Sequence, residues 1–123
     1  MKKALRVNTD FTTEVLNLEP DSYTPLRDAV GGLIQPVDLS PTLTLWCNEE
    51  GKLMGLTPSI IGTHMWEKSF GMTDVIVGNV VFTGGTDEDG ETLGLDPKQL
   101  YKLKSLAEEL RNKYEGAVTV IYG

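Results

Sequence analysis

The sequence predicts a single α+β domain, a mostly antiparallel twisted sheet of about six strands with one long C-terminal helix and one or two short helices packed on it. The chain has 123 residues and 40% hydrophobic content, which suffices for one core and is too little for two ordinary domains. Short apolar segments recur between turn residues, as is typical of strands. One segment near the C-terminus carries the start signals of a helix. The predicted single globular domain therefore spans residues 1–123.

Three stretches in the first half of the chain have the character of strands. Residues 2–9 and 12–19 carry apolar side chains among polar ones on either side of a short turn, which predicts an N-terminal hairpin. Residues 33–48 offer two further extended pieces, where Pro36 and Pro41 limit ladder pairing and indicate edge or irregular strands. This edge protection favours a monomer, while an exposed sheet face would equally allow a homodimer.

A short helix is predicted between these extended stretches, in residues 21–32. Ser22 or Thr24 is suited to the N-cap, and Pro25 to the first helical position, where its missing N–H is not needed. The glycine pair at the end of the segment stops the helix after one or two turns.

The stretch TLTLWC, residues 42–47, alternates threonine or tryptophan with leucine or cysteine and predicts a strand with two distinct faces. In the NEEG sequence that follows, residues 48–51, the asparagine suits the first position of a type I turn. Gly51 is suited to the left-handed conformation that closes a hairpin. The adjacent carboxylates of Glu49 and Glu50 are then exposed at a loop tip.

The middle of the chain predicts a helix followed by the central strand. Thr57 and Pro58 are a cap and a first helical residue, so the helix continues over residues 59–70 despite Gly62. Residues 74–83 are β-branched and almost wholly apolar, which indicates a strand in the middle of the core, bulged or bent at its glycine.

The C-terminal helix is predicted over Asp96 to Glu115. Asp96 is its N-cap, Pro97 its first residue and Gln99 the reciprocal partner of a capping box. An apolar stripe at spacings of three and four comprises Leu100, Leu103, Ala107, Leu110 and Tyr114. The solvated face carries Lys98, Lys102, Lys104, Glu108, Glu109, Arg111 and Lys113. The helix therefore docks on the sheet by one face, and residues 117–122 are predicted to form a final strand.

The charge of the chain disfavours direct contact with nucleic acid or anionic lipid. Lys and Arg total 11 against 18 Asp and Glu, a formal net charge of -7. No apolar run approaches the ~20 residues that span a bilayer. We therefore expect a soluble, unprocessed cytoplasmic protein with no membrane partner and no direct nucleic-acid partner. A single cysteine makes no intramolecular disulfide, which fits a reducing compartment.

The sequence shows no catalytic constellation, so we expect neither an enzyme nor a cofactor nor a metal centre. The one histidine, His64, is interpreted as an imidazole at the edge of the core beside Trp66. A nucleophilic Cys47 with His64 as base is conceivable. Nothing local lowers the pKa of this thiol, however, and Glu49 and Glu50 would raise it. Cys47 is in phase with buried leucines and is expected to act as a small hydrophobe.

The acidic loop of residues 86–91 partly matches a calcium-binding loop. Asp87 and Asp89 fit the third and fifth ligand positions. The first position falls on Gly85, which has no ligand side chain, and the twelfth on Asp96, which caps a helix. The match fails at these two anchors, so the loop is expected to be solvated, and a weak divalent site stays open as an alternative.

Several segments of the chain carry a family resemblance: MKKALRV, TLWCNEEGKLMGLTPS and DVIVGNVVFTG, followed by an acidic loop and GLDPKQL. Together they resemble a family of small proteins of unknown function that occur in bacteriophages, notably those of actinobacteria, and in other mobile elements. The resemblance covers most of the chain. Ser59 stands where the family usually has an asparagine, so no role of that asparagine carries over. The resemblance implies context and fold, and no activity, because the family has none established.

Three functions follow from these observations. The first is a non-enzymatic, phage-type accessory protein that binds a host protein in the bacterial cytoplasm. The second is a protein that sequesters a small molecule or nucleotide between the sheet and the middle helix, and the third is an acidic mimic of nucleic acid, which requires both acidic loops on one surface. The candidate partner-binding residues are Glu49, Glu50, Lys52, Asp87, Glu88 and Asp89. The candidate ligand-binding residues are Trp46, His64 and Trp66. The mimic would use Glu49, Glu50, Asp87, Glu88, Asp89 and Glu91.

Overall fold

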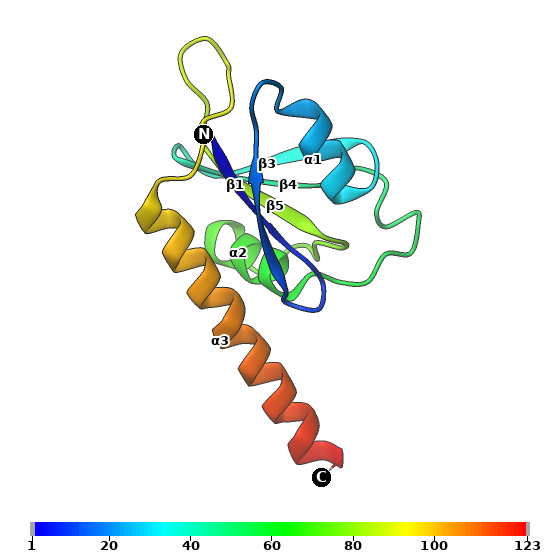
Figure 1. Cartoon of the computed structure of the whole chain (residues 1–123). Helices are drawn as coiled ribbons and strands as arrows, with labels where there is room; N and C mark the ends of the chain where they lie inside the picture. Colours follow the sequence, from blue (N-terminus) through cyan, green and yellow to red (C-terminus); the bar gives the residue numbers. More distant parts are fainter. Residues whose placement is uncertain (1, 123) are drawn as a thin grey trace.

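The computed structural model describes the backbone of residues 2–122 and the side chains of residues 2–114. Five strands and three helices follow one another along the chain (Figure 1). Their bounds are β1 Lys3–Val7, β2 Thr13–Asn17, α1 Tyr23–Val30, β3 Ile34–Ser40, β4 Leu43–Asn48, α2 Ile60–Phe70, β5 Val80–Gly84 and α3 Pro97–Tyr122. The predicted α+β class and the long C-terminal helix are confirmed.

All five strands form one antiparallel sheet in the order β2-β1-β5-β4-β3. The apolar strand β5 lies at its centre, as its composition predicts, and Val80, Val81 and Phe82 have no exposed surface. The strand is shorter than the predicted residues 74–83, because Gly78 takes a positive φ of 82° and bends the chain just before β5. The predicted N-terminal hairpin is confirmed as the pair of β1 and β2.

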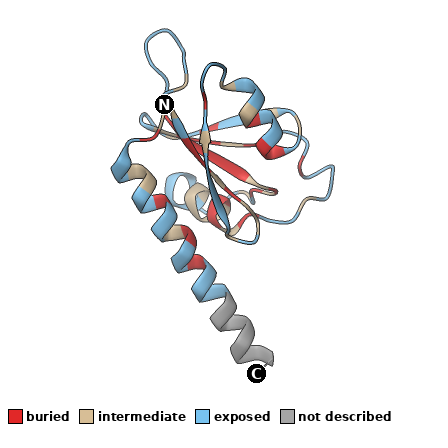
Figure 2. Cartoon of the chain, in the orientation of Figure 1, coloured by how far each residue is buried: buried red, intermediate tan, exposed pale blue. Residues whose placement is uncertain are grey.

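Helices cover both faces of the sheet (Figure 1): α1 lies on one face, and α2 and α3 lie on the other. Alternation along β4 divides its side chains between two hydrophobic clusters. Leu45 and Cys47 belong to the cluster under α2 and α3, whereas Trp46 packs against the cluster under α1. Figure 2 shows the buried residues concentrated along the strands and on the sides of the helices that face them.

The start of α3 has the predicted capping box. The amide of Gln99 donates to Asp96 Oδ1 at 2.7 Å, and the amide of Asp96 donates to Gln99 Oε1 at 3.0 Å. Within the predicted stripe, Leu103, Ala107 and Leu110 are buried. The stripe therefore docks α3 on the sheet, as predicted.

Two helix starts differ from the prediction. Ser22 occupies the N-cap position of α1, as predicted, but its side chain makes no capping hydrogen bond; the carboxylate of Asp21 instead accepts hydrogen bonds from the amides of Tyr23 and Thr24 at 3.0 and 3.2 Å. Pro25 is consequently the third helical residue.

For α2 the cap is Ser59, whose Oγ accepts from the amide of Gly62 at 3.0 Å. The predicted cap and first residue, Thr57 and Pro58, precede the helix, and Pro58 instead forms an isolated β-bridge with Val77. In both helices a side chain one to three residues away from the predicted position reaches the free amides.

The predicted final strand of residues 117–122 is wrong, since α3 continues to Tyr122 and the sheet of the described residues has five strands rather than six. Propagation of a nucleated helix adds one hydrogen bond per residue. A single internal glycine costs only about 1 kcal/mol, so the glycine at 116 does not end the helix, contrary to the prediction.

Candidate functional site

The turn after β4 begins at Asn48, the residue that the sequence predicts for its first position. The amide of Gly51 donates to Asn48 O at 3.1 Å, and the amide of Glu50 donates to Asn48 Oδ1 at 2.8 Å. Glu49 and Glu50 are both exposed, as expected for a loop tip. The Asn48 side chain is buried and also donates to Val30 O at 3.2 Å. The turn is therefore anchored to the protein body by its first residue.

The predicted role of Gly51 is wrong. The chain does not form a hairpin here but continues through a loop to α2, and the loop glycine with a positive φ, 67°, is Gly55. A Cβ atom at Gly51 would lie 2.8 Å from Val77 Cγ2, so the close approach of the segment before β5 is what requires a glycine. Sequence alone does not reveal this contact because Val77 is distant along the chain.

Two loops meet beside this turn, one after β4 and one after α2. Lys52 Nζ forms an ion pair with Asp74 Oδ1 that joins them. The hydrogen bond from Lys52 holds the pKa of the Asp74 carboxyl below its usual value. The indole N–H of Trp66 donates to Thr73 Oγ1 at 2.9 Å, which fixes the second loop to α2.

A hollow of about 310 Å³ lies between these loops, β3 and β4. The residues that line it are Gln35, Val37, Cys47, Asn48, Glu49, Lys52, Leu53, Trp66, Asp74, Val75, Ile76 and Val77. It therefore brings together three of the predicted site residues, Glu49, Lys52 and Trp66, which sequence reasoning had assigned to different functions.

Cys47 lies at this hollow as a buried free thiol. Burial, with a smaller contribution from the carboxylate of Asp74, raises the pKa of the Cys47 thiol. The thiol is therefore protonated at neutral pH and is a poor nucleophile. His64, the base of the conceivable pair, does not line the hollow.

Exposed apolar side chains lie at the hollow and along the elements that form it, and we use the name apolar rim for Leu53, Met54, Phe70, Met72 and Val75, of which Leu53 and Val75 line the hollow itself. Leu53 and Met72 are 89% and 88% exposed. The Phe70 ring lies 4.5 Å from the Trp66 ring, centroid to centroid, and so extends the rim along α2. Exposed apolar groups of this size on neighbouring loops are typical of a protein-binding surface.

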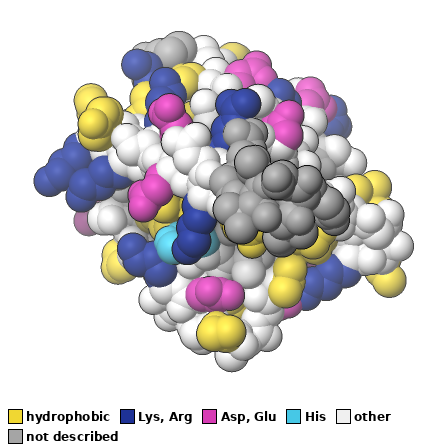
Figure 3. Space-filling model, turned by 90° about the horizontal axis from the view of Figure 1, so that it is seen from below, with side chains coloured by type: hydrophobic (Ala, Val, Ile, Leu, Met, Phe, Trp, Pro, Cys, Tyr) yellow, Lys and Arg dark blue, Asp and Glu magenta, His cyan; other side chains and the backbone are white. Residues whose placement is uncertain are grey.

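The three predicted ligand-binding residues do not form one pocket. Trp46 lies on the α1 face of the sheet, where its indole N–H donates to Thr83 Oγ1 at 2.9 Å. His64 and Trp66 lie on α2, on the opposite face. The reason is the alternation of β4, since Trp46 must point away from the side to which Cys47 points. Figure 3 shows the histidine side chain at the surface, close to lysine or arginine and hydrophobic side chains.

The second acidic loop lies at the other end of the sheet. β4 and β5 are antiparallel and pair Leu43 with Gly84, so the end of β5 lies beside the start of β4 (Figure 1). The loop that holds Asp87, Glu88 and Asp89 is thus separated from Glu49 and Glu50 by the length of β4. A nucleic-acid mimic that uses both loops is therefore wrong, because it required them on one surface.

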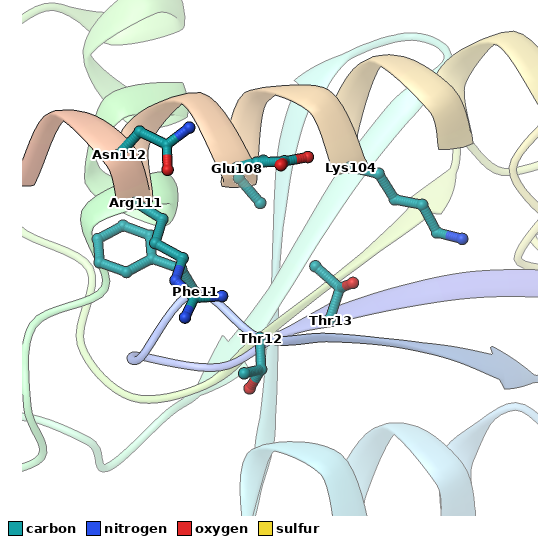
Figure 4. A pocket seen from close by; sticks show the side chains of 8 residues that line it. Phe11, Thr12, Thr13, Lys104, Glu108, Arg111 and Asn112 are labelled. Carbon is teal, nitrogen blue, oxygen red and sulfur yellow. The ribbon is translucent and has the colours of Figure 1, made fainter. Parts of the chain in front are cut away.

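A second hollow, of about 620 Å³, was not foreseen from the sequence and lies between the β1–β2 turn and α3 (Figure 4). Phe11, Thr12, Thr13, Lys104, Ala107, Glu108, Arg111 and Asn112 line it. Phe11 has a positive φ of 71°, which is unusual for a bulky residue. Its ring lies 5.9 Å from the ring of Tyr114, which ties the turn to α3. From the sequence, the charged residues of this hollow, Lys104, Glu108 and Arg111, were interpreted only as part of the solvated face of the helix.

The described residues contain no group of three or more His, Cys, Asp or Glu side chains placed to hold a metal ion. No helix among them is both long and apolar enough to cross a bilayer.

The structure thus defines a small α+β domain with one hollow beside α2, at which the apolar rim lies, and another beside α3. A family model described as a domain of unknown function (DUF3846) matches residues 1–111, and the chain belongs to this family. The comparison confirms the predicted resemblance to a family of unknown function. No curated protein and no solved structure matches the chain.

Proposed function

We propose that this protein is a non-enzymatic accessory protein of phage type that binds a host protein in the bacterial cytoplasm through the apolar rim. The observation that carries the proposal is the exposure of Leu53 and Met72, which are 89% and 88% exposed on two loops that the Lys52–Asp74 ion pair joins. The resemblance to phage proteins supplies the context of the proposal.

The rim has the composition of a protein interface. Apolar and aromatic side chains lie next to charged ones here: Leu53, Trp66 and Val75 line the hollow together with Glu49, Lys52 and Asp74, and a mixture of apolar and polar groups is usual for interfaces. Glu49 and Glu50 are exposed at one side of the rim. The partner surface that fits has apolar side chains at its centre and Lys or Arg at its border.

The state of the titratable groups at the hollow supports binding rather than catalysis. The Cys47 thiol is kept protonated by burial, since its pKa is raised. The Asp74 carboxylate is held ionised by Lys52, since its pKa is lowered. A general acid or base needs a pKa moved toward neutrality, and Asp74 is moved the other way.

The test is differential capture from a bacterial lysate. A tagged wild-type chain, a Leu53→Ser/Met72→Ser variant and a Leu93→Ser variant are compared by quantitative mass spectrometry. Leu93 is an exposed leucine beside the second acidic loop and serves as the matched control. We expect one host protein to be enriched by the wild type and the control, and to be lost from the rim variant. Equal recovery by all three chains would contradict the proposal.

A second candidate function rests on the hollow itself. Its volume of about 310 Å³ is near the lower end of small-molecule pockets, and Trp66 with Lys52 offers an aromatic ring and a cation to a small ligand such as a nucleotide. Native mass spectrometry of protein purified without refolding tests this function. An added mass of a few hundred daltons that is reduced by Trp66→Ala would favour it over the protein partner.

A further inference from the structure

β2 is an edge strand of the sheet, so its outer side has no neighbouring strand among the described residues. In an antiparallel pair, hydrogen-bonded residue pairs alternate with pairs that exchange no hydrogen bonds. The amide of Asn8 donates to Thr12 O at 2.9 Å, which fixes that pair as hydrogen-bonded. The amide of Leu18 likewise donates to Lys2 O at 2.8 Å. By alternation, the residues of β2 whose N–H and C=O groups point away from β1 are Thr13, Val15 and Asn17.

The opposite edge of the sheet, β3, is blocked. The amide of Glu49 donates to Leu33 O, so the same alternation directs the backbone nitrogen of Pro36 outward. Proline has no N–H, and the register shifts between Asp38 and Ser40. A proline and a bulge are the usual means by which a sheet prevents edge pairing. β2 has neither proline nor lysine, so this edge is open to another strand.

The open edge lies beside the hollow under α3. Thr13 pairs with Val7, and Val15 with Leu5, whose side chains belong to the core under α2 and α3, so Thr13 and Val15 point to the same side. Val15 is nevertheless an exposed residue, because α3 does not cover β2. In Figure 4 the hairpin strands run beneath α3, with Thr13 on the side of the helix. Thr13, at the start of the edge, lines the hollow, so this end of the edge and α3 together form a groove.

The groove is relatively basic on an acidic protein. Lys104 and Arg111 line it from α3, with Glu108 between them along the helix. Lys104 and Arg111 together with Glu108 give the lining one net positive charge, whereas the whole chain has a formal net charge of -7. Arg111 already interacts electrostatically with Asp10 in the hairpin turn. Lys104 is therefore the cation that a newly bound carboxylate would meet.

We propose that the groove between β2 and α3 binds an extended, acidic segment of a partner protein, which adds to β2 as a further antiparallel strand. The backbone of the segment pairs with Thr13, Val15 and Asn17, and its carboxylates on the helix side meet Lys104. A second copy of this chain fits less well. Pairing of two β2 strands about Val15 would place Thr13, Val15 and Asn17 of the other copy on the same side of the sheet as α3, and none of these is anionic.

This surface is independent of the apolar rim, since it is built from the N-terminal hairpin and α3. The two proposals can fail separately. Loss of binding after a change in the rim tests the function proposed above, whereas the experiment that follows uses only changes at β2 and α3.

The experiment titrates the full chain with two end-blocked octapeptides, one alternating threonine and glutamate and the other alternating threonine and lysine, and follows backbone amides by NMR. We expect the glutamate peptide to shift the amides of Thr13, Val15 and Asn17 and to bind at least about tenfold more tightly than the lysine peptide. Methylation of every second amide nitrogen of the glutamate peptide, on the side facing β2, is expected to abolish binding, because the ladder needs those donors.

The matched variants are Lys104→Glu and Lys102→Glu, which change the net charge equally. Lys102 is exposed on the same helix and does not line the hollow. We expect Lys104→Glu to lower the affinity for the glutamate peptide by about tenfold, and Lys102→Glu to leave this affinity within about twofold of the wild-type value. Absence of binding at millimolar peptide, equal binding of both peptides, or a dimer that already protects the β2 amides would overturn the proposal.

Discussion

The two acidic loops of this protein have similar compositions and different structures. The first follows β4 and is joined to the body by the buried Asn48 and by the ion pair of Lys52 with Asp74. The second lies between β5 and α3, and it is closed by its own contacts, since Asp87 Oδ1 accepts the amides of Asp89 and Glu91 at 2.9 Å each. The first loop presents exposed apolar side chains beside its carboxylates. Acidic composition alone therefore does not identify a binding loop, whereas anchoring and apolar neighbours do.

Replacement of the side chain that holds each loop in place, Asn48 or Asp87, gives the largest expected difference. Asn48→Ala removes the hydrogen bond to Val30 O and leaves that carbonyl without its side-chain donor, so it should lower the free energy of unfolding by about 2–3 kcal/mol. Asp87→Ala breaks hydrogen bonds in an exposed turn and should cost less than about 1 kcal/mol. The free energy of unfolding of both variants is measured by urea denaturation. Equal losses would show that the second loop is anchored as firmly as the first.

The glycines of the two loops give the next contrast. Gly51→Ala places a Cβ 2.8 Å from Val77 Cγ2, and because valine is stiff at χ1 this overpacking should cost about 1–2 kcal/mol. Gly90 has a φ of 80° and open space around its missing Cβ, so Gly90→Asn should change stability by less than about 0.5 kcal/mol. Thermal unfolding distinguishes the two. A neutral Gly51→Ala would mean that the first loop does not pack on the segment before β5.

The ion pair between the loops has the smallest expected effect on stability. Lys52→Met should cost no more than about 1 kcal/mol at neutral pH, because both partners are partly exposed. The pKa of Asp74 is lowered in the folded protein, so its contribution is present above the ordinary carboxyl value of 3.8 and is lost as the pH falls through the lowered pKa. Unfolding free energies of wild type and variant, measured from pH 7 to about pH 2, should therefore converge at the acid end. A difference in unfolding free energy that persists at the acid end would show that Lys52 acts by packing.

Local patterns in the sequence sufficed to predict the elements whose causes are local. The alternation of β4, the hairpin of β1 and β2, and the capping box of Asp96 and Gln99 all depend on residues within a few positions of one another. The exposed turn at Glu49 and Glu50 was predictable for the same reason. Each of these patterns predicts the same local structure in any globular domain that contains it.

Features that depend on distant residues were missed. The reason for Gly51 is a contact with Val77, and the separation of Trp46 from Trp66 follows from helices on both faces of the sheet. The alternation of residues 42–47 places Trp46 on the strand face opposite Cys47, but it does not predict that helices cover both faces. The hollow at β2 depends on how α3 lies across the sheet, for which Lys104 and Arg111 gave no local signal.

The most direct test of the central claim is hydrogen exchange of the protein alone and in complex with the host protein captured from the lysate. If the apolar rim is the binding surface, amides of residues 49–54 and 70–75 are protected in the complex, while those of residues 86–91 exchange as in the free protein. Protection of the second acidic loop, with the rim residues unchanged, would contradict the account.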